Sequence, residues 1–213
     1  MARAVTFTFL LSILVVSSMS WLAVTSRAQD ASTPPVTASP EASLNVVLPT
    51  VEQVPNGLVI ISDGDRTLDD VASGFSDPAA AIEQFTGWGW QGNLIRAFHV
   101  ANDTSSDPTA IDGIYISVHE FGTPQFAAEA FDYSLDAHAA DTNLEEIRVE
   151  EQGDYSRALY GEMPYGNEIS LYVQRGTLLI RLSASSPEGD PTVEATGLMQ
   201  TILNSQPATP AAT

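Results

Sequence analysis

Three stretches of the chain alternate apolar and polar residues with a period of two. They run through residues 114–119, 168–174 and 178–183, and in each of them every second residue is Ile, Leu or Val. This period predicts β-strands with one buried face. Between the second and third stretches, Arg175 and Gly176 indicate a tight hairpin turn. Weaker patterns predict further strands at 58–62, 94–101, 144–149 and 155–161.

Three helix starts share one device, an oxygen-bearing side chain followed by proline. They are Asp77-Pro78, Thr123-Pro124 and Asp190-Pro191. The side-chain oxygen can accept from an unpaired backbone N–H, and the fixed φ of proline suits the first helical position. The helices predicted behind them cover residues 79–85, 125–140 and 192–203. The second is the most regular, because its apolar residues recur at i, i+3 and i+4.

Hairpin-connected strands dominate this order of elements, so parallel crossovers are not required. We expect an α+β fold, with a mainly antiparallel sheet of about five to seven strands and about three helices packed on it. The helices lie on one face of the sheet, or on both faces if the sheet is strongly bent.

The N-terminal segment has the features of a secretory signal peptide. Arg3 is followed by a nearly continuous apolar stretch over residues 5–24, and Ser26-Arg27-Ala28 places small residues at −3 and −1 of a cleavage point. This pattern predicts a signal peptide over residues 1–28, cleaved after Ala28, and a secreted or cell-envelope location. An uncleaved anchor is the alternative, since the apolar stretch is long enough to span a bilayer.

Composition divides the rest of the chain into three parts. Residues 29–50 begin with a run rich in Pro, Ser, Thr and Ala and form the predicted linker, and residues 206–213 have the same composition and form a predicted disordered tail. The predicted globular domain covers residues 51–205.

The charge and the absence of cysteine exclude several functions. The formal net charge is −19, lysine is absent, and removal of the signal peptide leaves six arginines against 27 acidic residues, a charge of −21. Nucleic acid and anionic membranes would repel such a chain, so membrane contact is expected only through an uncleaved signal segment. With no cysteine there is no disulfide, thiol catalysis or Cys-ligated metal.

Two segments resemble a known family. Residues 149–155, with Gly153-Asp154 before a strand, and residues 171–179, with the Arg175-Gly176 hairpin, are similar to the second half of PsbP/Mog1-like domains. The similarity is greatest to the extracellular sensor domains of actinobacterial Ser/Thr kinases and related lipoproteins, although the disulfide cysteines of the kinase sensors are missing. It spans about residues 77–205. The resemblance implies a non-enzymatic binding or accessory role and assigns no functional residue.

Motifs for catalysis or metal binding are absent from the sequence. The acidic run at residues 63–70 has Leu68 where a calcium-binding EF-hand loop requires glycine, and no Gly-x-Ser-x-Gly nucleophile motif occurs. His99, His119 and His138 fall on three different predicted elements, which disfavours a shared metal. We therefore expect no cofactor and no metal, and a non-catalytic protein. A small secreted hydrolase using carboxylates and a structural envelope component are the alternatives.

Two groups of residues are candidates for ligand binding. Trp88 and Trp90, in a Gly-Trp-Gly-Trp phrase, belong either to the core or to an aromatic platform. Four polar residues of the alternating strands point away from the apolar positions, either into water or as a shallow recognition surface, because Tyr and Arg are frequent in binding hot spots. The ligand would be a small molecule, a glycan or a protein of the envelope. These four residues are Tyr115, His119, Tyr172 and Arg181.

Overall fold

The computed structural model describes residues 44, 46–101 and 107–206. The predicted signal peptide, residues 29–43 of the predicted linker and residues 207–213 of the predicted tail lie outside the described residues.

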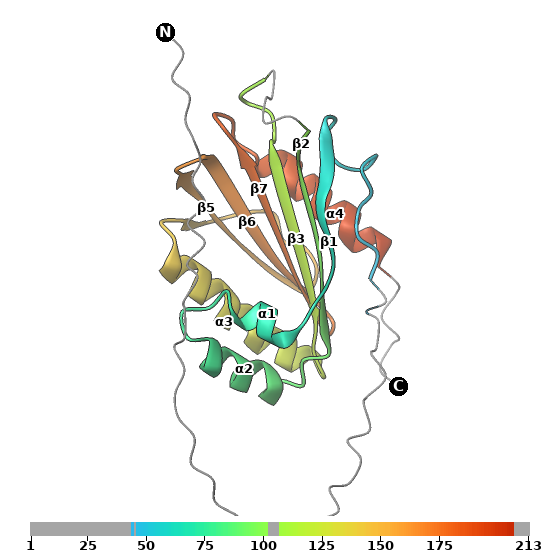
Figure 1. Cartoon of the computed structure of the whole chain (residues 1–213), viewed down its shortest axis with the longest axis vertical. Coiled ribbons are helices and arrows are strands. Elements are labelled where there is room, and N and C mark those ends of the chain that lie inside the picture. Colours follow the sequence, from blue (N-terminus) through green and yellow to red (C-terminus); the bar gives the residue numbers. More distant parts are fainter. Residues whose placement is uncertain (1–43, 45, 102–106, 207–213) are drawn as a thin grey trace, which may run out of the picture. The chain divides into compact units, whose positions relative to one another are not determined.

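A single seven-stranded antiparallel sheet forms the centre of the domain, in the order β1-β2-β3-β7-β6-β5-β4 (Figure 1). The prediction of an α+β fold with a mainly antiparallel sheet is confirmed. The strands are β1 (Leu58–Arg66), β2 (Gly92–Val100), β3 (Gly113–Glu120), β4 (Glu145–Ile147), β5 (Tyr155–Met163), β6 (Gly166–Arg175) and β7 (Leu178–Ser186).

Four helices cover both faces of this sheet. Figure 1 shows α1, α2 and α3 together at one end of one face, with α4 on the opposite side. Helices α3 and α4 both contact β6 and β7, the central strands. The helices are α1 (Leu68–Ala72), α2 (Pro78–Gly87), α3 (Pro124–Asp141) and α4 (Thr192–Ser205).

The apolar positions of the alternating strands form the core beneath α4. Ile116 and Ile180 are fully buried there, and Met199 of α4 packs in the same cluster. Period-two alternation thus located this layer correctly, because a pleated strand sends successive side chains to opposite faces. At the end of the β6–β7 hairpin, Arg175 pairs with Leu178, so the turn residues are Gly176 and Thr177, one position later than predicted.

The polar face of the same strands differs from the expectation. We expected it to point away from the helices, but α1–α3 cover part of it. His119 is only 8% exposed and Tyr172 only 2%. A second cluster containing Phe85, Phe121 and Phe131 fills the space between this face and the helices. The sheet is therefore buried on both sides at the end where α1–α3 lie.

Helix caps explain where the helices begin. Asp77 and Thr123 cap α2 and α3 as predicted, each accepting from a backbone N–H three residues on. Helix α4 differs, because Pro191 itself is the N-cap residue. The Asp190 carboxylate still accepts from the N–H of Thr192, at 2.9 Å. The short α1 begins with a capping box between Thr67 and Asp70.

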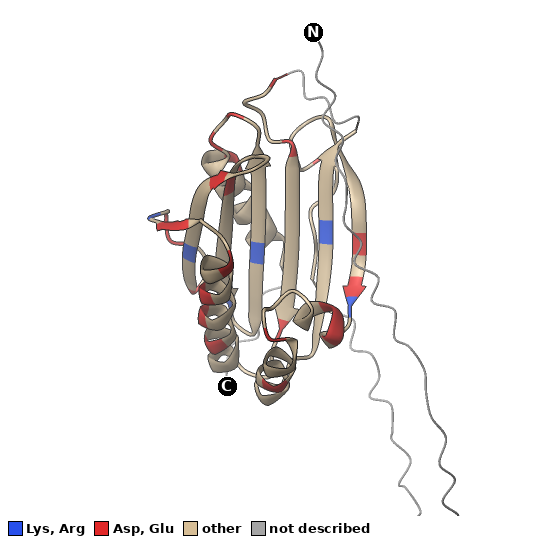
Figure 2. Cartoon of the chain, turned by 60° about the vertical axis from the view of Figure 1, so that its left-hand side comes forward, with Lys and Arg blue, Asp and Glu red and all other residues tan. Residues whose placement is uncertain are grey.

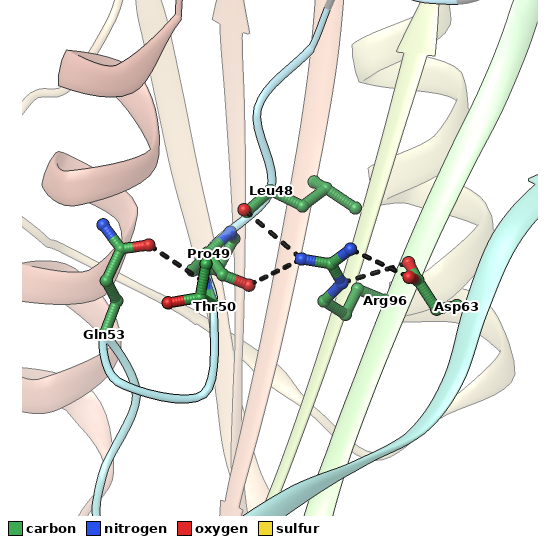
Figure 3. A network of polar contacts seen from close by, with 6 residues as sticks. All are labelled: Leu48, Pro49, Thr50, Gln53, Asp63 and Arg96. Carbon is green, nitrogen blue, oxygen red and sulfur yellow. Dashed lines mark hydrogen bonds and ion pairs between the residues drawn. The ribbon is translucent and has the colours of Figure 1, made fainter.

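The packed domain extends beyond the predicted boundaries at both ends. Leu48, which we placed in the linker, is 5% exposed and belongs to the core beneath α4. Figure 3 shows the guanidinium of Arg96 held between the carbonyls of Leu48 and Pro49 on one side and the carboxylate of Asp63 on the other. Gln206, which we placed in the tail, is buried and forms two hydrogen bonds with the backbone of Val47.

Acidic residues are spread over helices, loops and strands, whereas basic residues occur singly (Figure 2). None of the helices in the described part of the chain combines the length and the apolar character needed to cross a membrane.

Candidate ligand-binding site

A cavity of about 190 Å³ lies between the polar face of the sheet and helices α1–α3. The four polar strand residues proposed from the sequence line it together: Tyr115 and His119 from β3, Tyr172 from β6 and Arg181 from β7. They share one face because their positions alternate with the buried apolar ones, and adjacent strands place Tyr172 opposite Arg181. Further lining residues come from β1, β3 and α3: Arg66, Ser117, Ser134, Ala137, His138 and Asp141.

Arg66 reaches the cavity from the last position of β1. Its Nε donates to Asn93 Oδ1 at 2.7 Å and its Nη2 to Ser117 Oγ at 3.3 Å. Asn93 is 1% exposed and its amide donates to Ser117 Oγ at 2.8 Å and to the carbonyl of Val118 at 2.9 Å. These contacts hold the guanidinium in place through its Nε and Nη2. Its Nη1 has no partner among the described residues.

The orientation of His119 follows from its neighbours. The indole Nε1–H of Trp90 lies 3.3 Å from Nδ1 of His119, and an indole N–H can only donate, so Nδ1 accepts. The proton of the neutral ring is therefore on Nε2, which donates to Ser117 Oγ at 3.1 Å. Burial, and then the charges of Arg66 and Arg181, lower the pKa of His119 to about 3, so the ring is neutral at pH 7.

Ser117 thus receives hydrogen bonds from three sides, from Arg66, Asn93 and His119. All three groups are donors that share the two lone pairs of its oxygen, and its own hydroxyl proton has no acceptor in the described part of the chain. A hydroxyl surrounded by donors in this way can itself donate to a ligand.

A second chain of hydrogen bonds starts at Arg181. Its Nη2 lies 3.4 Å from Nε2 of His138, and because a guanidinium only donates, that ring nitrogen accepts. Nδ1–H of His138 then donates to Tyr172 Oη at 2.9 Å, so the phenol proton of Tyr172 has no acceptor within the described residues. Burial, followed by the charge of Arg181, lowers the pKa of His138 to about 4, and burial raises the pKa of Tyr172 to about 12.

Both arginines lie close to one aromatic ring, that of Tyr115. The guanidinium carbons of Arg66 and Arg181 are 6.0 and 5.8 Å from the ring centroid of Tyr115, within range of cation–π attraction. Over the described residues, no carboxylate lies within 4.0 Å of either guanidinium. Asp141 is the one acidic residue in the cavity lining, and it is exposed at the end of α3. Two arginines without a salt bridge to any described residue thus line the cavity.

Apolar side chains complete the walls. Phe85 is 1% exposed and packs edge-on against Phe75 and His119. Val71 of α1 and Leu179 of β7 also line the cavity and are almost fully buried. The cavity therefore combines a polar floor of hydrogen-bond donors with an aromatic and aliphatic wall.

The two tryptophans proposed from the sequence take a different role. Both are half-buried and pack against the cluster beneath α1–α3, and neither lines the cavity. Trp88 Nε1 donates to Glu129 Oε2 at 2.9 Å. Trp90 acts on the site indirectly, by fixing the tautomer of His119. These positions do not form an aromatic platform around the cavity.

Sequence reasoning did not identify Arg66, Ser117 and His138 as parts of the site. Ser117 lies between Tyr115 and His119 on the same strand face, so the period of two contained that signal. Arg66 and His138 come from a strand end and from α3, which only tertiary packing brings to the sheet. The predicted separation of His99 and His119 agrees with the register, in which His99 pairs with Gly113 and His119 with Asn93. No group of three or more His, Cys, Asp or Glu residues suited to a metal occurs in the described ranges.

No model of a known protein family matches this chain, and no curated protein matches it significantly.

Proposed function

We propose that this protein is a non-catalytic binding module of the bacterial cell envelope, and that its ligand is a small molecule carrying an anionic group. The anionic group would enter the cavity between α1–α3 and the sheet and pair with Arg66 and Arg181. The resemblance to PsbP/Mog1-like domains agrees with a binding or accessory role.

The observation that carries this proposal is that the cavity floor presents hydrogen-bond donors that have no acceptor in the described part of the chain. Arg66 and Arg181 have guanidinium nitrogens without partners among the described residues, and Ser117 and Tyr172 have hydroxyl protons without acceptors there. A chain with a formal charge of −19 has many carboxylates available, yet none of those in the described ranges forms a salt bridge with these two arginines. A carboxylate or phosphate accepts hydrogen bonds from guanidinium and hydroxyl groups, and such charge-assisted bonds are the strong ones.

The geometry disfavours a serine hydrolase at the same place. Ser117 and His119 are within hydrogen-bond distance, as a nucleophile and its base would be. A catalytic histidine must accept the serine proton on one ring nitrogen and donate from the other to a carboxylate. In His119 the polarity is reversed, because Trp90 donates to Nδ1 and leaves the proton on Nε2. A pKa of about 3 also makes this ring a weak base.

Calorimetric titration of the purified protein with acetate, benzoate and inorganic phosphate tests the proposal. At least one of these anions should bind, and Arg181→Met should weaken its binding at least tenfold, since one charge-assisted contact contributes about 1.5–3 kcal/mol. The matched control is Arg148→Met. Arg148 is exposed, and the change removes the same charge from a position outside the cavity.

Equal loss of binding in Arg181→Met and Arg148→Met would show that only overall charge matters and would overturn the assignment of the cavity. Absence of binding by all three anions to the unchanged protein would overturn the proposed function itself. Circular dichroism of each variant shows whether it is folded, and Arg66→Met provides a second removal of a cavity guanidinium.

Export of the protein belongs to the same proposal. Its support is the sequence pattern of residues 1–28, with Arg3, the apolar stretch and the small residues before Gln29. N-terminal sequencing of the protein from the extracellular fraction should give Gln29 or a near neighbour. A start at Met1 in a membrane fraction would instead support the uncleaved anchor.

A further inference from the structure

A shallow trough adjoins the cavity along the same face of the sheet. Its volume is about 260 Å³, and Tyr115 lines both it and the cavity. In the register of β3 and β7, Tyr115 pairs with Ser183 and Ser117 with Arg181, so the two spaces are one step apart along the strands, roughly 7 Å. Helices α1–α3 lie together at one end of this face (Figure 1). None of their residues lines the trough.

The trough has a floor of small residues between two large exposed ones. Ala97, Gly113 and Ser183 belong to the floor. Ile61, at the irregularity in β1, is 64% exposed on one side, and Tyr165, in the turn between β5 and β6, is 49% exposed on the other. An apolar occupant of the trough would cover these two side chains and remove their apolar surface from water.

The charges of the two spaces are opposite. The cavity presents Arg66 and Arg181, whereas the trough presents Glu168, which is 7% exposed and accepts hydrogen bonds from Tyr165 and Ser170. An anionic group is therefore attracted at the cavity end and repelled at the trough end. This polarity gives an elongated ligand a single direction.

From this arrangement we infer that the ligand is an amphipathic anion, with its charged group in the cavity and an apolar chain lying along the trough. The inference rests on the proposed function and adds the chemical class of the ligand. The cavity alone, at about 190 Å³, is smaller than the roughly 300–1,000 Å³ of pockets that enclose drug-sized ligands. A longer ligand must extend out of the cavity, and the trough is the continuation that shares Tyr115 with it.

Titration of the purified protein with butanoate, hexanoate, octanoate and 8-aminooctanoate tests this inference. Affinity should rise about two- to fourfold for each added methylene, the range that corresponds to partial and full burial of a methylene. Octanoate should bind more tightly than 8-aminooctanoate, because the ammonium group would lose hydration beside the exposed side chain of Ile61. Tighter binding of 8-aminooctanoate would show that Glu168 receives a cation and would overturn the apolar chain.

Two variants separate the trough from the cavity. Ile61→Ser should weaken octanoate binding at least threefold and leave butanoate binding unchanged. Val193→Ser is the matched control, since Val193 is 80% exposed on α4, which covers the opposite face. If butanoate binds in an Arg181-dependent way but affinity does not rise with chain length, this inference is wrong and the proposed function stands. If no carboxylate binds, both fail.

Discussion

At the scale of single residues, the most informative group is the neutral His119. Its ring is enclosed by Phe85 and Phe121, receives a hydrogen bond from Trp90, and lies near two guanidinium groups. Burial disfavours the charged imidazolium, and nearby positive charges disfavour it further. The part of this shift that comes from Arg66 and Arg181 reflects a positive potential in the cavity, the kind of potential that the proposed anionic ligand requires.

The low pKa of His119 predicts a loss of stability on acidification. In the unfolded chain the ring takes up a proton near pH 6.5, whereas in the folded protein it does so only near pH 3. Between these values the unfolded state binds more protons, so stability falls as the pH falls from about 6.5 toward 3. From pH 7 to pH 5 this single group should lower the free energy of unfolding by about 2 kcal/mol.

Urea denaturation of the unchanged protein and of His119→Gln at pH 7 and pH 5 measures this contribution. The variant should lose about 2 kcal/mol less than the unchanged protein over that interval. Between pH 7 and pH 8.5 the two proteins should change nearly in parallel, because His119 is neutral in the folded protein and already mostly neutral in the unfolded chain. Parallel loss between pH 7 and pH 5 would show that His119 is protonated in the folded protein.

At the scale of elements, the turn that ends α2 contains a glycine in the left-handed conformation. We find the left-handed conformation at Gly89, with φ 63°, and Gly87 is the last residue of the helix. The N–H of Gly89 donates to the carbonyl of Thr86 and the N–H of Trp90 to that of Phe85. This pair of bonds is a Schellman motif, which satisfies the last carbonyls of the helix. It directs Trp90 toward His119, so the turn contributes to the site.

The two glycines of this phrase should therefore respond differently to alanine. Gly89→Ala places a side chain in the left-handed region and should lower the free energy of unfolding by about 1–2 kcal/mol. A Cβ at Gly87 meets no atom within 4 Å, and the residue is helical, so Gly87→Ala should be neutral or stabilise by up to about 1 kcal/mol. Thermal unfolding of both variants checks this. A larger loss in Gly87→Ala than in Gly89→Ala would contradict the observed end of α2.

At the scale of the whole molecule, the chain before β1 is part of the packed domain. Residues 46–50 lie against β2 and the end of α4, held by the side chains of Arg96 and Gln206 and by burial of Leu48 (Figure 3). Segments more than 150 residues apart in the sequence are thereby joined, since Val47 bonds to Gln206. The two ends of the described chain stabilise each other.

A pair of substitutions in this segment tests its contribution. Leu48→Ala removes a side chain that is 5% exposed and should lower the free energy of unfolding by about 2–4 kcal/mol. Its neighbour Val47 is 50% exposed, so Val47→Ala should change stability by no more than about 0.5 kcal/mol. Chemical denaturation gives both values. Equal and small effects would mean that residues 46–50 behave as the linker that the composition predicted.

The sequence by itself determined the course of the strands, the starts of α2 and α3, and the division of strand residues between two faces. These features depend on local chemistry: period-two alternation, side-chain caps and proline at the first turn act over a few neighbouring residues. They also placed Tyr115, His119, Tyr172 and Arg181 on one face, because alternation within each strand fixes which side chains point the same way.

Only the tertiary structure decided what lies above that face. Arg66 reaches the cavity from an edge strand and His138 reaches it from α3. No local sequence pattern predicts that these elements lie near the centre of the sheet. The same holds for Leu48 and Gln206. The segments around them have the composition of a linker, but the burial of these two side chains depends on partners far along the chain. The cavity and its paired arginines arise from long-range packing, which is set by the fit of whole elements to one another and is not encoded in any short segment.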